Sequence, residues 1–329
     1  MVVIGASQDE KIQGKVQAAM RIGFFGTPEL AARVLADLKN MHDVRFAVTA
    51  EDREAGRNRV MQFCPAKTQA LGLNIPVLQP ASLKDADFME MIRSYGADIF
   101  VVVAYGNLIP RPVFDLPALK TINLHPSLLP RYRGAAPIQW ALINGEKETG
   151  ITVQLINEKL DAGDIVIQEV VALNDDTTAA DLNEIVAFRG AELLDKAMRE
   201  LASAHPKLIR QDETMATFCR KIDRDVAMIE WNRPAEEIHN LVRGLNPKPV
   251  AFSGFRGENI KIWKTALVHE DISETAEPGR IIRYKKKRLL AGTGAGFIEI
   301  LGIQPANKKI MDALSFINGY RLVPEDRFA

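Results

Sequence analysis

The chain has 329 residues, of which 47% are hydrophobic and 26% charged, and these values are typical of a soluble globular protein with two domains. Lys and Arg together number 42, as do Asp and Glu, so the net charge of zero argues against a polyanion partner bound by overall charge alone. Two cysteines, Cys64 and Cys219, stand far apart without a CxxC pair, which argues against a disulfide framework and a structural zinc site.

The sequence contains no obvious membrane or export segment. No apolar run approaches the roughly 20 residues of a membrane span. Residues 1–19 are mostly polar and lack the apolar stretch of a signal peptide. We therefore expect a cytoplasmic protein with no membrane partner, in which residues 1–19 are an extension without a catalytic role.

The first two thirds of the chain alternate between strand and helix patterns. Residues 21–25 form an apolar run, and a helical pattern follows over 29–38, with Pro28 in its first turn and Thr27 as a candidate cap. Similar patterns predict strands at 46–49, 98–104, 120–124 and 149–156, and helices at 84–95, 135–144 and 178–203. Strands that alternate with helices predict an α/β fold with a doubly wound, mostly parallel sheet.

The last third has a different organisation. After a polar connector, a helix is predicted at 235–245, and short strands at 259–263, 279–282, 288–290 and 296–301 predict a small antiparallel, OB-like β-barrel. Residues 220–329 carry 19 basic and 14 acidic side chains, which hints at a phosphate-bearing partner, although a chance imbalance explains it equally well. We divide the chain into an N-terminal extension (1–19), an α/β catalytic domain (20–205), a linker (206–223) and a C-terminal β-barrel (224–329).

Three polar side chains are expected at the carboxyl ends of the parallel strands. Asn123 ends one strand, His125 follows on the same side of an extended chain, and Asp161 lies in the loop after 149–156. A carboxamide can polarise a carbonyl, an imidazole can move a proton at neutral pH, and a carboxylate can hold the imidazole or order a water beside it. Taken alone, each of these short patterns is more often structural, so the residues by themselves leave acyl-type transfer and a structural role both open.

The stretch NLHPSLLPRYRGAAPIQWALINGEKETGIT (123–152), followed by LDAGDIV (160–166), resembles the folate-dependent formyltransferase superfamily. The resemblance implies that Asn123, His125 and Asp161 match the catalytic asparagine, histidine and aspartate. It also implies 10-formyltetrahydrofolate as co-substrate and no metal. The folate site would be lined by Ser127, Leu128, Leu129 and Pro130.

Four further stretches resemble the methionyl-tRNA formyltransferases within that superfamily. They are FGTPE (25–29), DREAGR (52–57), VAYG (103–106) and IQPANKKIM (303–311). The VAYG stretch implies that Tyr105 and Gly106 join the folate site. The DREAGR loop and the C-terminal stretch imply initiator methionyl-tRNA as acceptor, and we expect the enzyme to be a monomer that serves translation initiation.

The resemblance to these enzymes also suggests basic residues that neutralise tRNA phosphates. They are Arg57, Arg59 and Lys67, together with Lys285, Lys286 and Lys287. The run at 285–288 is explained equally well as a solvated hairpin tip. The basic loop departs from the family pattern, with Glu54 for proline and Asn58-Arg59-Val60 for Gly-Lys-Lys, and NPKP at 246–249 replaces NPWP, so tRNA affinity is expected to be weaker or differently distributed.

Two other functions compete with this interpretation. A sugar-nucleotide N-formyltransferase or a formyltetrahydrofolate hydrolase would share the catalytic segment, and the basic loop at 52–59 and the QPANKK stretch argue against both. An RNA- or folate-binding protein without turnover is a different class. The presence of all three of Asn123, His125 and Asp161 argues against that class.

Overall fold

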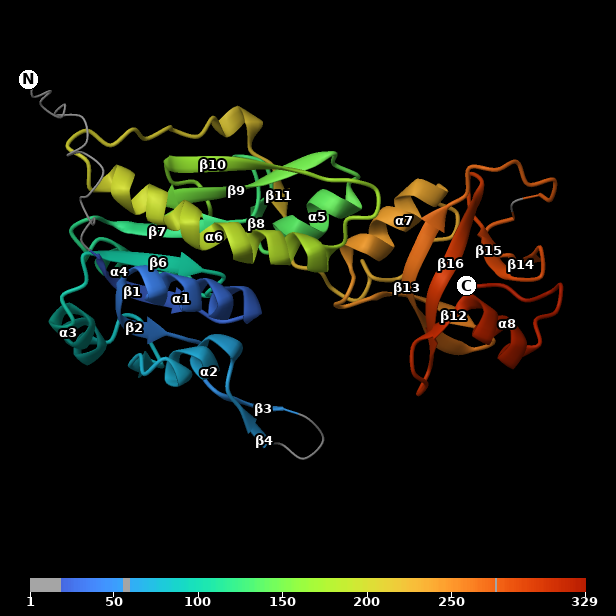
Figure 1. The fold of residues 1–329 in the computed structure, drawn as a ribbon, viewed down its shortest axis with the longest axis horizontal. Coiled ribbons are helices and arrows are strands. Elements are labelled where there is room, and N and C mark those ends of the chain that lie inside the picture. Colours follow the sequence, from blue (N-terminus) through green and yellow to red (C-terminus); the bar gives the residue numbers. More distant parts are fainter. Residues whose placement is uncertain (1–18, 56–59, 276) are drawn as a thin grey trace, which may run out of the picture.

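The computed structural model describes residues 19–55, 60–275 and 277–329 of the chain. Figure 1 shows two parts side by side along the long axis: an α/β part, coloured blue to yellow, and a β-rich C-terminal part, coloured orange to red. Within the described residues, no helix combines the length and the apolar character that crossing a membrane requires.

The α/β part is built on a seven-stranded sheet with the order β10-β9-β7-β6-β1-β2-β5. The strands are β1 (Arg21–Gly26), β2 (Asp43–Val48), β5 (Val77–Leu78), β6 (Ile99–Val103), β7 (Thr121–His125), β9 (Glu148–Leu155) and β10 (Ile165–Ala172). The strands from β7 to β5 pair in parallel, whereas β9 is antiparallel to both of its neighbours. The predicted α/β fold with a mostly parallel sheet is therefore confirmed.

Helices cover both faces of this sheet. They are α1 (Glu29–Met41), α2 (Pro65–Gly72), α3 (Ala86–Ser94), α4 (Arg111–Phe114), α5 (Pro137–Ile143) and α6 (Ala179–Leu201). Along β1, Ile22 and Phe24 belong to the core shared with α1 and α6, whereas Phe25 belongs to the core shared with α3 and α4. Because successive side chains of a strand point to opposite faces, a continuous apolar run is what a strand buried on both faces requires. Burial of each such side chain contributes roughly 1.5–3 kcal/mol.

The predicted cap of the first helix is wrong. Pro28, not Thr27, holds the N-cap position of α1, and no side chain caps the helix. The Thr27 hydroxyl instead donates a hydrogen bond to the Tyr105 carbonyl at 3.0 Å. This bond ties the turn after β1 to the segment after β6, at the carboxyl edge of the sheet.

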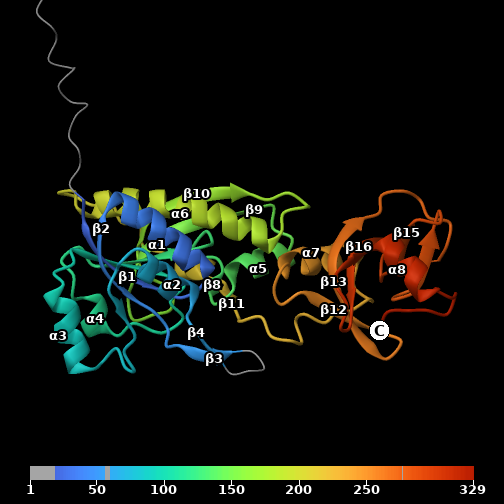
Figure 2. The ribbon, with the colours of Figure 1, turned by 60° about the horizontal axis from the view of Figure 1, so that its bottom comes forward.

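A short hairpin projects from the α/β part, as Figures 1 and 2 show. It consists of β3 (Arg53–Ala55) and β4 (Val60–Gln62), which pair in antiparallel fashion. The hairpin extends on the same side of the molecule as β12 of the C-terminal part in Figure 1.

The C-terminal part is an antiparallel sheet with the order β12-β13-β16-β15-β14, and β17 pairs with β16. The elements are α7 (Ala235–Gly244), β12 (Ala251–Phe255), β13 (Glu258–Leu267), β14 (Ile281–Tyr284), β15 (Arg288–Gly292), β16 (Phe297–Pro305), β17 (Met311–Asp312) and α8 (Ala313–Tyr320). Within the described residues β12 and β14 do not pair with each other, so the predicted antiparallel sheet is confirmed but direct closure into a barrel is not. Isolated bridges join Phe255, at the end of β12, to Phe328, and Arg280, just before β14, to Arg327. The C-terminal segment therefore contacts both edge strands of the sheet.

The connector between the two parts turns back onto the α/β part. In it, β11 (Phe218–Cys219) pairs in parallel with β8 (Arg133–Gly134), a short strand that follows β7 in the chain. The segment expected to be a polar linker therefore contains paired and buried residues.

Candidate active site

Strand β7 brings two of the predicted catalytic residues to the carboxyl edge of the sheet. Asn123 and His125 lie two residues apart on this strand, so their side chains point to the same face. The Asn123 side chain is half-buried, and its carboxamide makes no hydrogen bond with any residue that the structure describes. Its amide donor is therefore available to a bound carbonyl oxygen.

The His125 ring is buried, and its two nitrogens face different groups. Nε2 lies 2.9 Å from the carbonyl oxygen of Tyr132. Because a carbonyl only accepts hydrogen bonds, Nε2 carries a hydrogen, and Nδ1 is the nitrogen that can gain or lose a proton. Nδ1 lies 3.7 Å from Oδ1 of Asp161, which is too long for a direct hydrogen bond but close enough for the carboxylate to attract a protonated ring.

The Asp161 carboxylate is oriented by two donors. The main-chain N–H of Gly134 donates to Oδ2 at 2.8 Å, and the Gln154 side-chain amide donates to Oδ1 at 3.2 Å. Asp161 has a φ of 49°, in the left-handed region that residues other than glycine rarely occupy. The structure thus brings Asn123, His125 and Asp161 to one place, with the carboxylate held toward the ring.

The loop that carries Asp161 packs tightly against the end of β9. A Cβ atom at Gly163 would overlap the carbonyl oxygen of Leu155, so only glycine fits there without a shift of the backbone. The position of Asp161 therefore depends on a glycine two residues along the chain.

Three residues that support this site were not predicted from the sequence. Gln154, Arg133 and Gln211 are almost fully buried and hydrogen-bonded around the Asp161 loop. Gln154 has a signal in the sequence, because it is a polar residue within an apolar strand pattern. Gln211 has none, since it stands in a stretch that reads as a polar connector.

The predicted folate residues lie at the same edge of the sheet as β7. Tyr105 and Gly106 follow β6, the parallel neighbour of β7. The Tyr105 side chain is buried against Phe25, with ring centroids 5.6 Å apart, and burial raises the pKa of its hydroxyl. Gly106 is exposed and has a φ of 88°, a conformation that favours glycine.

The second group of predicted folate residues forms the loop after β7. Ser127 and Leu129 are buried, whereas Leu128 and Pro130 are half-buried. The Ser127 hydroxyl donates to the Arg131 carbonyl at 2.7 Å, so it supports the loop itself. Leu128 and Pro130 are therefore the members of this group with exposed surface.

A cavity of about 520 Å³ opens beside the Asp161 loop. Phe114 and Ile156 give it apolar surface, and Ala162, Gly163 and Gln211 border it from the catalytic loop and the connector. Most of the residues that line it are charged or polar, such as Arg111, Lys120 and Glu158, so its lining differs from the mostly apolar one that is usual for a small-molecule site.

The predicted tRNA-binding residues fall into three sets. Arg57 and Arg59 lie outside the described residues. Lys67 is not a free cation, because its ammonium donates to Asp52 at 2.5 Å and to Gln79 at 2.7 Å. The hydrogen bond from Lys67 is the main cause of the lowered pKa of Asp52, and this pair anchors the base of the β3–β4 hairpin.

The lysines 285–287 form the turn between β14 and β15. Lys285 lies 3.0 Å from Glu270, while Lys286 and Lys287 are exposed and have no acidic partner within the described part of the chain. Figure 1 places this strand pair on the side of the C-terminal part that is remote from the α/β sheet.

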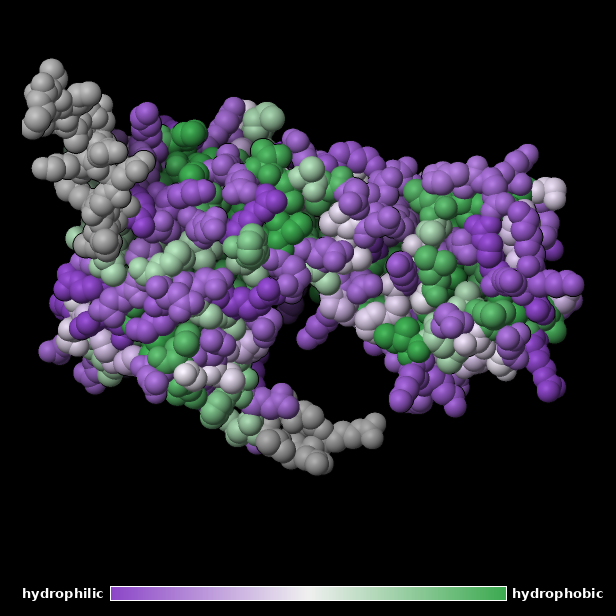
Figure 3. Space-filling model, viewed as in Figure 1, coloured by the Kyte–Doolittle hydropathy of each residue, from purple (hydrophilic) through white to green (hydrophobic). Residues whose placement is uncertain are grey.

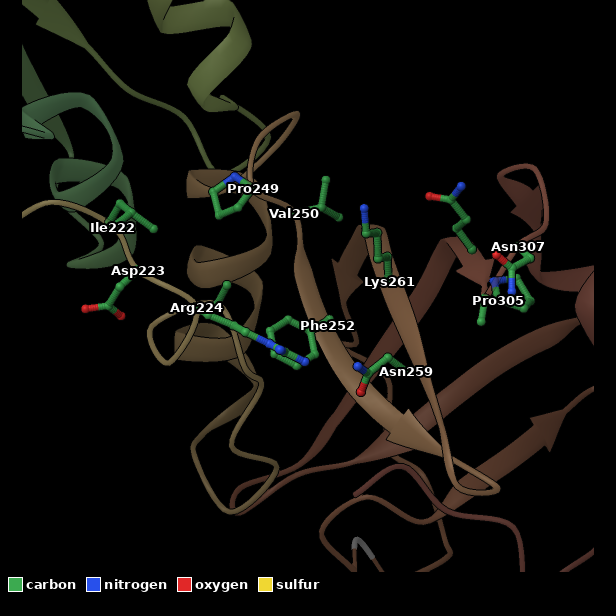
Figure 4. Close-up of a pocket in the computed structure, with 13 residues that line it drawn as sticks. Ile222, Asp223, Arg224, Pro249, Val250, Phe252, Asn259, Lys261, Pro305 and Asn307 are labelled. Carbon is green, nitrogen blue, oxygen red and sulfur yellow. The ribbon is translucent and has the colours of Figure 1, made fainter. Parts of the chain in front are cut away.

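A second cavity, also of about 520 Å³, lies between the connector and the C-terminal sheet (Figure 4). Arg224 is exposed and lies over the Phe252 ring, 5.5 Å from its centroid, and Lys261 stands on the neighbouring strand. Neither cation has a carboxylate partner among the residues that the structure describes. Figure 3 shows that the molecule is hollowed below the junction of its two parts.

No group of three or more His, Cys, Asp or Glu side chains within the described ranges is arranged to hold a metal ion. Asp161 is the carboxylate that lies within 4 Å of the His125 ring nitrogens in the described part of the chain. The donors at the site are a carboxamide and an imidazole, which suit a carbonyl substrate and proton transfer.

Comparison with known proteins shows two matching family models. The family model described as formyl transferase matches residues 20–198, and the model described as formyl transferase, C-terminal domain, matches residues 221–321. The chain is 38% identical over 301 residues to the methionyl-tRNA formyltransferase of Clostridium novyi (strain NT). This alignment covers 91% of this chain and 97% of that protein. It is 38% identical over 306 residues to the methionyl-tRNA formyltransferase of Moorella thermoacetica, and this alignment covers 93% of this chain and 98% of that protein.

Solved structures share the fold at lower identity. HypX from Aquifex aeolicus in complex with tetrahydrofolic acid aligns with a TM-score of 0.63 at 17% identity, over 92% of this chain and 48% of that one. The sugar 3N-formyl transferase WlaRD aligns with a TM-score of 0.62 at 20% identity, over 89% of this chain and all of that one. These likenesses concern the fold alone.

Proposed function

The chain belongs to the formyl transferase family, and we propose that it transfers the formyl group of 10-formyltetrahydrofolate to the α-amine of methionyl-tRNA. The observation that carries the proposal is the juxtaposition at the end of β7. The free carboxamide of Asn123 lies on the same face as His125, whose Nδ1 lies near an oriented Asp161.

The acceptor is a neutral amine. A free α-amino group titrates at roughly 7.7–8.0 and an esterified one no higher, so a useful fraction is unprotonated at neutral pH. The amine nitrogen attacks the formyl carbon and forms the new C–N bond. The carbonyl oxygen then becomes an oxyanion, which the amide of Asn123 and the protonated Nδ1 of His125 bind.

Collapse of the intermediate breaks the bond between the formyl carbon and N10 of the folate. The amine loses a proton and N10 gains one, so the proton balance closes without an oxidant or a metal. We assign the proton transfer to His125, which gives its Nδ1 proton to N10 as the bond breaks and then takes one from the acceptor amine. Asp161 stabilises the charged ring. A donor aimed at an oxyanion contributes about 2.7–4 kcal/mol to transition-state stability, and proton transfer by a positioned side chain about 10²–10⁴-fold in rate.

For the folate co-substrate, we propose a site formed by Tyr105, Gly106 and the loop of residues 127–130. These segments follow the adjacent parallel strands β6 and β7, and strand ends of this kind are where α/β sheets bind ligands. Within the loop, Leu128 and Pro130 supply the contact surface, and Ser127 and Leu129 supply its support.

For the tRNA, we propose that both parts of the protein contribute cations. Arg57 and Arg59 fall between β3 and β4 in the sequence, and Arg224 and Lys261 border the second cavity (Figure 4). The C-terminal sheet would act as an OB-like tRNA-binding domain over residues 224–329, joined by a linker at 206–223 to the catalytic domain at 20–205. We further propose a cytoplasmic monomer that formylates the initiator tRNA.

A paired assay tests the function. The wild-type protein is given 10-formyltetrahydrofolate and either initiator or elongator Met-tRNA, with Asn123→Ala as control and an amino-sugar nucleotide as a second acceptor. Formylation of initiator Met-tRNA well above the control is expected. Transfer to the sugar alone, or release of formate without an acceptor, would contradict the assignment.

A further inference from the structure

Residues 209–220 of the connector, here called the return segment, pack directly on the catalytic loops. Ile209 exchanges two main-chain hydrogen bonds with Ile165, just after the Asp161 loop. Further along, β11 of the return segment pairs with β8, just after the loop that follows His125. The return segment thus lies against both loops on which the catalytic side chains depend.

Within the return segment, Gln211 makes the central contacts. Its side-chain amide donates to the carbonyls of Gly163 at 2.7 Å and Asp161 at 3.0 Å. It also lies 3.2 Å from Oε1 of Gln154, the residue whose own amide donates to the Asp161 carboxylate. Gln211 therefore reaches the backbone of Asp161 directly and its carboxylate through Gln154.

The other end of the Gln211 carboxamide is fixed as well. Its Oε1 accepts from Arg133 Nε at 3.0 Å and from Nη2 at 2.8 Å. The Arg133 side chain is buried, and it also donates to both carboxylate oxygens of Glu213. Because Arg133 fixes the oxygen, the amide nitrogen of Gln211 has to face the Asp161 loop.

We propose that Gln211 is a positioning residue for formyl transfer, which holds the Asp161 carboxylate at its distance from His125 through Gln154 and the loop carbonyls. The inference rests on the proposed function. Asp161 sits at a positive φ, a conformation that persists only when the surroundings hold it. Without Gln211, the Gly134 N–H would still donate to Oδ2, but the loop carbonyls and Gln154 would lose their support and the carboxylate would shift beside the ring. A displacement of about 1 Å at a catalytic group can reduce the rate about 10²-fold.

The variant Gln211→Met keeps the length of the side chain and removes its hydrogen bonds. We expect kcat for Met-tRNA formylation to fall about 10–100-fold while KM for Met-tRNA changes less than about threefold, because Gln211 acts on the reacting groups and not on tRNA binding. The kcat–pH profile should also differ from that of the wild type, since the Asp161 carboxylate is displaced from the ring. Unchanged kcat and an unchanged profile would overturn the proposal.

A control separates positioning from general loss of stability. Asn183→Leu removes a half-buried carboxamide that donates to the Ala179 carbonyl in α6, remote from the return segment, and should leave kcat and the pH profile as in the wild type. Unfolding midpoints of both variants are compared. A fall in kcat for Gln211→Met that merely tracks the folded fraction would also overturn the proposal.

A second variant keeps the inference testable if Gln211→Met folds poorly. Gln154→Met breaks the link to the carboxylate, and the double variant should lose little more activity than the worse single variant, because the two residues act on one group. Independent, additive losses would contradict the relay. If the wild-type protein formylates no Met-tRNA, the proposed function fails; if it does and both glutamine variants keep full kcat, only this inference fails.

Discussion

Cys219 and His125 share a single acceptor, the main-chain carbonyl of Tyr132. The imidazole Nε2 lies 2.9 Å from this oxygen and the thiol sulfur 3.4 Å from it. The carbonyl therefore fixes the ring nitrogen other than the one near Asp161, and it also binds the return segment to the loop after β7.

This arrangement predicts low reactivity of the Cys219 thiol. Burial raises the pKa of Cys219, so the thiol stays protonated at neutral pH, and the thiolate is the reactive form. Cys64 is half-buried and should react with iodoacetamide at least about tenfold faster in the native protein. Mass spectrometry of tryptic peptides measures both rates, and equal labelling would show that the site opens readily.

Removal of the imidazole should affect turnover far more than folate binding. For His125→Ala we expect kcat to fall at least about 100-fold, because the role of the ring arises in the transition state. The dissociation constant of the folate should change less than about threefold, as measured by isothermal titration calorimetry. If kcat and folate affinity fell by similar factors, His125 would act in binding the folate in the ground state instead.

The packing of the Asp161 loop predicts opposite effects of two glycine substitutions. Gly163→Ala forces a Cβ onto the Leu155 carbonyl and should destabilise the protein by roughly 2 kcal/mol or more, with loss of activity. In Gly72→Ala, at the end of α2, the new Cβ meets no atom within 4 Å, and a gain of about 0.4–1 kcal/mol is expected. Urea unfolding of both variants measures the difference; a tolerated Gly163→Ala would show that the loop can shift.

The cations at the second cavity should contribute to tRNA binding through phosphates. Arg224→Ala is expected to raise KM for Met-tRNA and to reduce the slope of log Kd against log salt by about one. Arg45→Ala removes an exposed arginine paired with Asp43 on the α/β part and should change neither. If Arg224→Ala leaves the salt slope intact, the tRNA does not reach this cavity.

A buried histidine makes stability depend on pH. His42 lies 3.1 Å from Asp195, and its pKa is lowered chiefly by burial, against the opposing effect of that carboxylate. Because the unfolded chain takes up the proton more readily, the free energy of unfolding should be full above about pH 6.5 and fall as the pH drops toward the lower folded-state pKa. Urea unfolding at pH 7.5 and 5.5 should show a smaller drop for His42→Asn than for the wild type, and an equal drop would assign the effect to other groups.

The sequence predicted the α/β part well because local patterns determine it. The apolar runs of β1 and β6 and the helical spacing of α1 and α6 can be recognised from residues that are close together in the chain. By contrast, β10 has an edge-strand pattern in which polar residues interrupt the apolar ones, and it was not predicted. The absence of a direct β12–β14 pairing also could not be read from the short strands, because it depends on contacts between the ends of the sheet.

The candidate site likewise contains some residues that the sequence predicts and one, Gln211, that it does not. Asn123, His125 and Asp161 stand out through residue type and resemblance. Gln211 is visible only in three dimensions, because its partners Gly163 and Arg133 lie 48 and 78 residues away in the chain. Polar residues that are buried through such distant partners look like surface residues in a sequence.

The return segment also orders events during synthesis of the chain. All three side chains that we propose to be catalytic are synthesised before residue 162, and the last strand of the α/β sheet and its last helix follow by residue 201. Gln211 and β11 come later still, so a nascent chain that has released the complete sheet has the Gly134 and Gln154 donors to Asp161 but still lacks the contacts from Gln211. The order of translation thus delays the Gln211 contacts until the connector has left the exit tunnel.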